Sequence, residues 1–534
     1  MALEKSRGEL SETASSDRSR QHSDDVEAGR GSEEDKIGSV PKTAPAPAGV
    51  DAYRCASHVS GPDTIHHHHL PAHDKETAPG DNSAAADDDD AMYHRLSPRR
   101  KRILVAVCSF CAFLSPQSST SVLAATPEVA AEYKTTGAVI NASNAGYMVL
   151  MGVSPIVWGP LSDVFGRRPV LLLTAALFFL LSAATALAPG LVAFFVFRAA
   201  TAFEGTAFIL LGAACIGDTY RPTERGTAIG WFLSGTLIGP AFGPFLGGIM
   251  VTYTSWTSIF WLQTALAGTA AVGVFLLVPE TIHRKRIAEL AGQTRRQKAA
   301  AVLAMVNPAR PLRLFRHWNQ VLVACGSSAL VWNMYSLLTP IRYVLNPRFR
   351  LQTPLLSGLF YLAPGSGYLL GTFVGGRWAD RTVRAWVRRR GGVRVAEDRL
   401  RSAVPFMGVV MPASILVYGW AVDRRVGGIA VPALALFVQG VGQLFSFPSL
   451  NTYCLDVIPG HGAEVTAANY FVRYLAGCLG TAVVLPAVEG VGVGWFETIS
   501  AGLLVASTAG VVATIRWGEG WRQGRRAEGR EAAE

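Results

Sequence analysis

Twelve long apolar segments constrain the fold of this chain more than any other feature. A helix needs about 20 mostly apolar residues to cross the hydrocarbon core of a bilayer. Six such segments lie at approximately 103–124, 139–159, 169–188, 191–216, 226–250 and 257–279. Six more lie at approximately 319–341, 355–376, 403–421, 429–455, 464–486 and 493–516. The sequence therefore predicts an all-α membrane protein with twelve transmembrane helices in two six-helix halves.

The regions around and between these two groups are polar. We expect a disordered cytoplasmic tail at 1–94, because this stretch is rich in Ser, Asp, Glu, His and Pro and has almost no long apolar run. The first half is predicted at 95–280 and the second half at 319–517. A basic cytoplasmic linker at 281–318 joins them, and residues 518–534 are expected to form a second cytoplasmic tail.

Lys and Arg beside the apolar segments favour one orientation in the membrane. Basic residues precede the first segment and follow the second, fourth, sixth and eighth segments. All these places lie on one side if the segments alternate in direction, so the positive-inside rule predicts that this side and both termini are cytoplasmic. One loop disagrees, because it would place Arg342, Arg348 and Arg350 outside.

The composition argues against a soluble basic protein. The chain is 50% hydrophobic and 16% charged, whereas soluble globular proteins carry about 25% charged residues. Its formal net charge of +10 reflects arginines that flank membrane segments rather than a soluble basic domain. We therefore expect no nucleic-acid partner.

A short motif occurs twice, at half-chain spacing. The first copy reads Gly159-Pro-Leu-Ser-Asp163-Val-Phe-Gly166-Arg167-Arg168-Pro169, and the second reads Gly376-Arg-Trp-Ala-Asp380-Arg381. In each copy a glycine precedes an aspartate by four residues and arginine follows. Each copy lies where a long apolar segment ends. An internal repeat at this spacing is typical of a transporter built from two related halves.

The fifth segment carries a regular pattern of glycine and proline. Its members are Gly235, Gly239, Pro240, Gly243, Pro244, Gly247 and Gly248. Glycines at four-residue spacing form a bare stripe that lets a partner helix approach closely, and each proline bends the helix. Gly367, Gly371 and Gly375 in the eighth segment offer a partner stripe. A simple packing seam is the alternative explanation.

Charged residues in and after the fourth segment are candidates for proton coupling. A charge at the bilayer centre costs about 2.5–3.5 kcal/mol on insertion scales, so Arg198 and Glu204 are expected to face a cavity or a partner. A carboxyl group in an apolar cavity can exchange a proton near neutral pH, so Glu204 is the candidate carrier. Six residues turn a helix by about 600°, so these two residues are not expected to pair. The alternative for Glu204 is a hydrogen bond between helices. Asp218 follows the same segment and completes the set.

These motifs resemble those of the Major Facilitator Superfamily, over nearly everything after residue 95. The nearest resemblance is to the fungal drug:proton antiporter family with twelve spans. In that family the loop at 159–169 latches the two halves together in the outward-open state, which implies this role for Asp163 and Arg167. A positive-inside loop with a helix cap is the simpler alternative. The glycine–proline pattern resembles a motif associated with antiporters, which implies export. Arg198 matches the family's buried arginine, which is linked to proton coupling, although Ala202 stands where the family usually has glycine.

The fold implied by this resemblance places the first, fourth, seventh and tenth helices around a central cavity. The polar residues there that suit a mostly apolar pocket are Gln117, Asn333, Tyr335, Gln439 and Gln443. Arg473, inside the eleventh segment, needs a counter-charge or carbonyl partners. It either touches an anionic or polar substrate or braces neighbouring helices.

We expect proton-coupled efflux of small organic molecules, such as drugs, toxins or secondary metabolites, by a monomer in the plasma membrane. The sequence has no phosphate-binding GxxxxGK[ST] loop, so ATP is not expected to drive transport. It has no metal-ligand spacing and no nucleophile–base arrangement, so no cofactor, metal or enzymatic activity is expected. One alternative is an organic-acid or nutrient carrier of the same fold. A second is a non-transporting membrane sensor, whose signature would be a long structured cytoplasmic domain.

Overall fold

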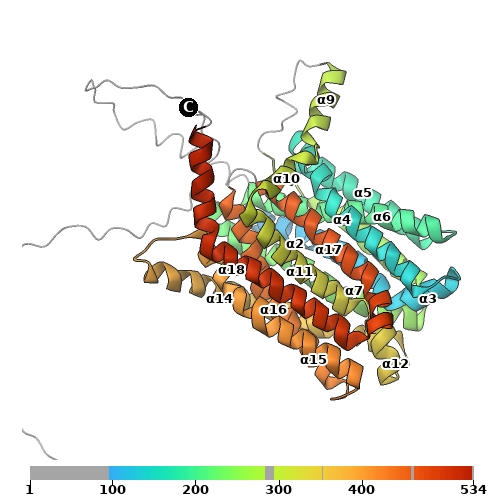
Figure 1. The fold of residues 1–534 in the computed structure, drawn as a ribbon. Coiled ribbons are helices and arrows are strands. Elements are labelled where there is room, and N and C mark those ends of the chain that lie inside the picture. The colour runs from blue at the N-terminus through green and yellow to red at the C-terminus, as the bar shows by residue number, and fades with distance from the viewer. Residues whose placement is uncertain (1–95, 283–293, 352, 459–461, 532–534) are drawn as a thin grey trace, which may run out of the picture. The chain divides into compact units, whose positions relative to one another are not determined.

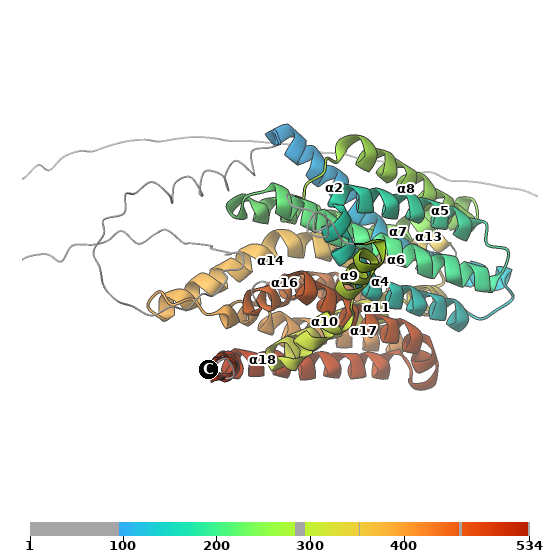
Figure 2. The ribbon, with the colours of Figure 1, turned by 90° about the horizontal axis from the view of Figure 1, so that it is seen from above.

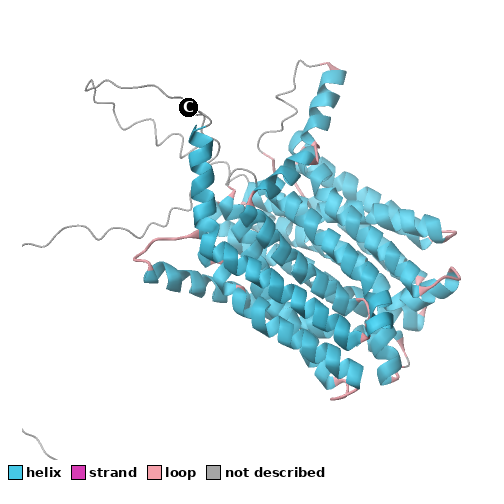
Figure 3. Ribbon diagram, in the orientation of Figure 1, coloured by secondary structure: helices cyan, strands magenta, loops and turns pink. Residues whose placement is uncertain are grey.

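The computed structural model describes residues 96–282, 294–351, 353–458 and 462–531. These residues form helices joined by short loops, and the described part of the chain contains no strand (Figures 1 and 3). Helices suit a membrane chain because every backbone N–H and C=O in hydrocarbon must be satisfied within the segment itself. The expected disordered tail at 1–94 lies outside the described residues.

Six long helices form the first half. They are α2 (Pro98–Ser121), α4 (Gly137–Phe165), α5 (Arg167–Ala186), α6 (Leu191–Thr219), α7 (Pro222–Tyr253) and α8 (Thr257–Leu277). Between α2 and α4 the chain runs through the short helices η1 (Val122–Ala125) and α3 (Thr126–Glu132).

Six long helices also form the second half. They are α11 (Trp318–Leu338), α14 (Leu362–Arg389), α15 (Met411–Arg424), α16 (Ala430–Val457), α17 (Gly462–Val491) and α18 (Val493–Glu531). The short helices that precede or join them are α9 (Arg295–Met305), α10 (Ala309–Arg313), η3 (Leu314–Arg316), η4 (Ile341–Leu345), α12 (Asn346–Phe349), α13 (Pro354–Phe360), η5 (Ala396–Asp398), η6 (Leu400–Ser402) and η7 (Phe406–Val410).

A helix stands at each of the twelve expected places, and 11 helical stretches of the described residues are long and apolar enough to cross a membrane. The exception is the eighth place. The segment at 355–376 is divided at Tyr361 between α13 and α14, and α14 then continues to Arg389 through a series of arginines. Glycine and arginine lower its hydropathy, yet its glycines pack against α16 as those of a bundle helix do.

Each half has an even number of long helices, so the described chain enters and leaves the bundle at the same end. We call the end that holds Pro98 and Gln523 the terminal end, and the end that holds Glu132 and Phe349 the distal end. Seen from above, the blue and green helices of the first half lie beside the orange and red helices of the second (Figure 2).

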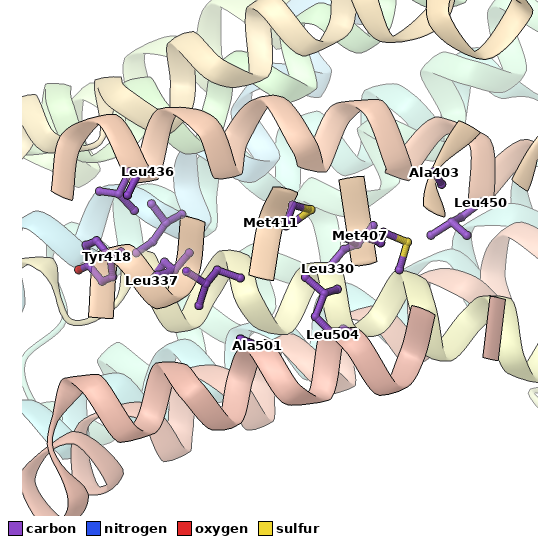
Figure 4. Close-up of a cluster of buried hydrophobic side chains, with 14 of the residues drawn as sticks. Leu330, Leu337, Ala403, Met407, Met411, Tyr418, Leu436, Leu450, Ala501 and Leu504 are labelled. Atoms are coloured by element: carbon purple, nitrogen blue, oxygen red, sulfur yellow. The ribbon is translucent and has the colours of Figure 1, made fainter. Parts of the chain in front are cut away.

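Each half has its own apolar core. In the second half Leu330 of α11, Met407 of η7 and Leu504 of α18 belong to one buried cluster (Figure 4). In the first half Phe178 and Phe208 pack edge to face within another cluster. The two halves also approach closely, because a Cβ atom at Gly152 of α4 would lie 3.3 Å from the Phe471 backbone of α17.

Candidate functional site

A cavity of about 120 Å³ lies between the two halves. Its walls come from α2, α6 and α7 of the first half and from α11, α14, α16 and α17 of the second half. Of the residues expected to line a substrate cavity, Tyr335, Gln443 and Arg473 do so. Most of the other lining side chains are apolar or aromatic, which is the usual character of a pocket for an organic molecule.

Three other residues expected in the cavity are buried but do not line it. Gln439 Nε2 donates to Gln443 Oε1 at 2.7 Å, so Gln439 positions a lining residue. Asn333 Nδ2 donates to the Ala329 carbonyl one turn earlier on α11 at 2.8 Å. Gln117 is fully buried, and neither of its amide atoms has a hydrogen-bond partner among the described residues. The sequence indicates which helices these residues occupy, but not how each helix is rotated.

Among the described residues that line the cavity, Arg473 is the one that carries a charge. Its side chain is 3% exposed. Nη2 donates to Asn451 Oδ1 at 2.9 Å, while Nε has no partner among the described residues. The guanidinium carbon lies 4.4 Å from the Phe447 ring centroid and 5.5 Å from that of Tyr470. Aromatic rings and one amide group thus surround this buried cation of the second half.

Arg198 and Glu204 are both buried in α6 but do not form an ion pair. Arg198 Nη2 donates to Asn144 Oδ1 of α4 at 2.7 Å, and its guanidinium lies 5.0 Å from the Tyr147 ring centroid. Glu204 is 6% exposed, and its Oε2 has no partner among the described residues. The separation agrees with the helical rotation between the two positions.

Arg167 gathers acidic side chains from several helices at the terminal end. Its Nη1 donates to Asp163 Oδ1 of α4 at 2.6 Å, and its Nε donates to Asp218 Oδ2 of α6 at 3.1 Å. Its backbone N–H donates to Glu280 Oε1, just after α8, at 2.9 Å. Gly166 turns the chain between α4 and α5 with φ of 107°, a conformation that favours glycine. These contacts tie helices of the first half together.

Arg168 of the first motif also contacts another helix of the first half. Arg168 Nη2 donates to the Phe275 carbonyl near the end of α8 at 2.8 Å. Asp218 lies about 30 Å along α6 from Arg198. The structure therefore groups Asp218 with Arg167 rather than with the buried charges of α6. Gly159 precedes the turn within α4.

The second copy of the motif does not form the same turn. Helix α14 passes without a break through Gly376, Asp380 and Arg381, whereas α4 ends just before Gly166. Asp380 and Arg381 are exposed, and the Asp380 backbone carbonyl accepts from Arg384 Nε at 3.3 Å. Both copies are helical from the glycine to the aspartate, but the turn at Gly166 that follows the first copy has no counterpart in α14.

A buried acidic pair that was not predicted from the sequence lies at the terminal end of the second half. Glu397 Oε2 accepts from Arg522 Nη2 of α18 at 2.6 Å, and Glu397 Oε1 accepts from the Tyr453 hydroxyl at 3.1 Å. Asp398 Oδ2 accepts from Arg390 Nη1 at 2.6 Å. Two adjacent carboxylates in an arginine-rich loop between membrane segments were the signal available in the sequence.

The glycine stripe of α7 packs against α2 within the first half. A Cβ atom at Gly235 would strike the Ser109 backbone oxygen, and one at Gly243 would lie 2.7 Å from the Gln117 backbone oxygen. Gly239 and Gly247 approach the same helix. Pro240 instead lines the cavity.

The expected pairing of this stripe with the α14 glycines is wrong, although Gly365 of α14 does approach Ala241 of α7. Gly367, Gly371 and Gly375 pack against the backbone of α16, which belongs to the same half. The α7 helix does reach the second half through Gly248, where a Cβ atom would lie 2.8 Å from the Pro354 carbonyl oxygen of α13. The Pro244 carbonyl lies on the same side, toward Gly358 of α13.

An ion pair joins the two halves at the distal end. Arg342 Nη2 of η4 donates to Glu128 Oε1 of α3, and Arg342 Nη1 donates to Ser357 Oγ at 3.2 Å. Arg348 Nη2 lies 3.8 Å from Asp423 Oδ1, within the second half. Arg342 and Arg348, which break the positive-inside pattern, therefore have acidic partners. The Glu128 contact was not predictable from the sequence pattern, because Glu128 lies beyond the predicted first segment.

The described residues contain no group of three His, Cys, Asp or Glu side chains that could hold a metal ion.

The model of the Major Facilitator Superfamily matches residues 108–481. The MFS-type transporter phiD of Fungal sp. (strain ATCC 74256) is 27% identical over 479 residues, which cover 83% of this chain and 71% of the relative. Citrate exporter 1 of Aspergillus niger is 26% identical over 468 residues, which cover 81% and 89%. The crystal structure of the human organic anion transporter MFSD10 (TETRAN) shares the fold, with a TM-score of 0.58, 17% identity and coverage of 78% of this chain and 100% of that chain.

Proposed function

Because this chain belongs to the Major Facilitator Superfamily, we propose that it exports small organic molecules in exchange for protons, by alternating access. The observation that carries this proposal is the cavity between the halves. The Glu128–Arg342 ion pair joins the two halves at the distal end. A binding site at the interface of two related halves, closed on one side at a time, is what alternating access requires.

We place the terminal end in the cytoplasm, with the plasma membrane as the location. The basic segments beside the membrane helices support this orientation. The tails at 1–94 and 518–534 and the linker at 281–318 are then cytoplasmic, and the conformation described here is closed to the outside. The protein acts as a monomer, since one chain supplies both walls of the cavity.

Glu204 is the proposed proton carrier. It lies inside α6, nearly buried, with one carboxylate oxygen that has no partner among the described residues. A carboxyl group in such surroundings can take up or release a proton when the surroundings change between the two states of a transporter. Arg198 on the same helix would respond to that change through its contacts with α4.

Asp163 and Arg167 are the proposed gating residues, together with Gly159, Gly166 and Arg168. The Arg167 cluster holds the ends of α4, α5 and α6 together, so these helices can move as a unit during the transition. Gly376, Asp380 and Arg381 lie in a continuous exposed stretch of α14, and their role would be limited to the surface of the second half.

The direction of transport is proposed to be outward. The resemblance of the α7 glycine–proline pattern to an antiporter motif supports this direction, as does the relative whose name is citrate exporter. One proton entering down 100 mV and one pH unit supplies roughly 3.7 kcal/mol. That energy supports a concentration ratio of a few hundred for a neutral solute exchanged one for one.

Transport into inverted membrane vesicles tests this proposal. An imposed pH gradient should drive accumulation of at least one labelled compound from a panel of drugs, secondary metabolites and organic acids. A protonophore and Glu204→Gln should each abolish this accumulation, while Glu132→Gln, which changes an exposed carboxylate outside the cavity, should not. Accumulation that persists without a proton gradient would refute proton coupling.

A further inference from the structure

Arg473 lies in the cavity without an acidic partner. Nη2 bonds to the amide oxygen of Asn451, and the described residues place no carboxylate oxygen within ion-pairing distance of this guanidinium. Arg342, another buried arginine, pairs with Glu128, whereas Arg198, which does not line the cavity, contacts an amide oxygen and aromatic rings as Arg473 does. Burying a cation is costly unless a counter-charge or hydrogen bonds compensate it.

Aromatic rings offset only part of this cost. The faces of Phe447 and Tyr470 lie close to the guanidinium, and each such contact contributes a modest attraction. Nε still has no partner among the described residues. Arg473 therefore has capacity to donate to a further acceptor.

The other polar groups of the cavity, which are hydroxyls and one amide, can also donate hydrogen bonds. The Tyr368 hydroxyl has no partner among the described residues. Gln443 accepts from Gln439 through its amide oxygen, which leaves its NH₂ group as a donor. No Asp or Glu belongs to the described cavity wall. A ligand that supplies negative charge and acceptor oxygens would satisfy these groups together.

We propose that the transported molecule carries an anionic group, such as a carboxylate, which binds Arg473 while its apolar or aromatic body lies against the tyrosines of the cavity. The proposal rests on the proposed transport function and narrows its substrate class. Arginine suits this task because its planar fork can donate two parallel hydrogen bonds to a carboxylate. The cavity is smaller than the usual ~300–1,000 Å³ of ligand pockets, so it holds a small acid or one end of a larger one.

Binding can be measured without any proton gradient, so failure of this inference is distinguishable from failure of proton-driven export. The full chain, purified in detergent, is titrated with matched pairs: benzoate and benzamide, phenylacetate and phenylacetamide, and citrate with its triamide. A ligand that binds only the folded state stabilises it by RT ln(1 + L/Kd), where L is the free ligand concentration, and therefore raises the thermal unfolding temperature. We expect at least one carboxylate to raise this temperature and its amide to have no effect.

Three variants assign the effect to the site, and a fourth serves as the control. Arg473→Gln should weaken carboxylate binding by about 10-fold or more, which is the effect of losing a charge-assisted hydrogen bond. Arg473→Lys should retain part of the binding, because it keeps the charge but not the fork. Tyr368→Phe keeps the volume, removes an unpartnered hydroxyl, and should weaken binding less. Arg348→Gln, which removes an arginine outside the cavity, should leave the ligand-induced shift unchanged.

Three results would overturn the proposal. The first is an equal shift from a carboxylate and its amide, and the second is an undiminished shift in Arg473→Gln. The third is no carboxylate-specific shift across the whole panel, in which case Arg473 braces α16 and α17 rather than binding substrate.

Discussion

Neutralising Glu128 should open the distal end of the bundle. The Glu128–Arg342 contact joins α3 of the first half to η4 of the second, and Ser357 holds the other arm of the same guanidinium. The Arg342 side chain is 8% exposed and the Glu128 side chain is 30% exposed. Glu128→Gln keeps the size of the side chain and one acceptor oxygen, so the change removes charge with little change in packing.

The magnitude follows from the burial of the pair. A hydrogen bond between charged groups contributes about 1.5–3 kcal/mol when buried. Because nearly a third of Glu128 is exposed to solvent, screening reduces this to about 1.5–2 kcal/mol. A free energy of about 1.4 kcal/mol changes an equilibrium tenfold, so the ratio of open to closed molecules at the distal end should rise about 10- to 30-fold.

Spin-label distance measurements test this shift. Labels at Glu132→Cys and Pro347→Cys, both exposed and on opposite halves, report the separation across the distal end in a background whose native cysteines are replaced by alanine. Glu128→Gln should add a population at longer distance. The matched control is Arg348→Gln, which breaks an ion pair with Asp423 inside one half and should leave the distribution unchanged. An unchanged distribution in Glu128→Gln would refute the reasoning.

Two further changes test packing and charge within the halves. Gly235→Ala places a Cβ atom against the Ser109 backbone oxygen and should lower stability by about 1–3 kcal/mol, whereas Gly230→Ala, which meets open space on the same helix, should be neutral or slightly stabilising in a thermal unfolding assay. Arg522→Ala leaves the buried Glu397 carboxylate without its cation and should lower stability by about 2–3 kcal/mol; an unfolding temperature equal to that of the wild type would contradict this.

The number and place of the membrane helices were predictable from the sequence, because hydrocarbon selects for apolar runs of a fixed length. The eighth helix shows the limit of that signal. Its apolar stretch is broken at Tyr361 and its helix continues to Arg389, because favourable helix geometry does not stop where hydropathy does. Likewise α18 extends to Glu531, beyond the expected end of the second half.

The contacts of the candidate site were less predictable. Arg342 and Glu128 are 214 residues apart in sequence, so no local pattern links them. Gln117 and Asn333 lie on the expected helices but turn away from the cavity, because a helix rotation of a fraction of a turn moves a side chain from one face to another. Arg473 was the easier prediction, since a charge inside an apolar segment points to a cavity or partner wherever it occurs.

The two copies of the repeated motif now tolerate change very differently. Position 166, three residues after Asp163, holds a turn in a backbone conformation that side chains with a Cβ atom rarely adopt, whereas position 383, three residues after Asp380, is a valine within the continuous helix α14. In a saturation scan of both positions, substitutions would be depleted at position 166 and accepted at position 383. The two copies therefore share a sequence pattern, but only the first is followed by a turn that depends on a glycine.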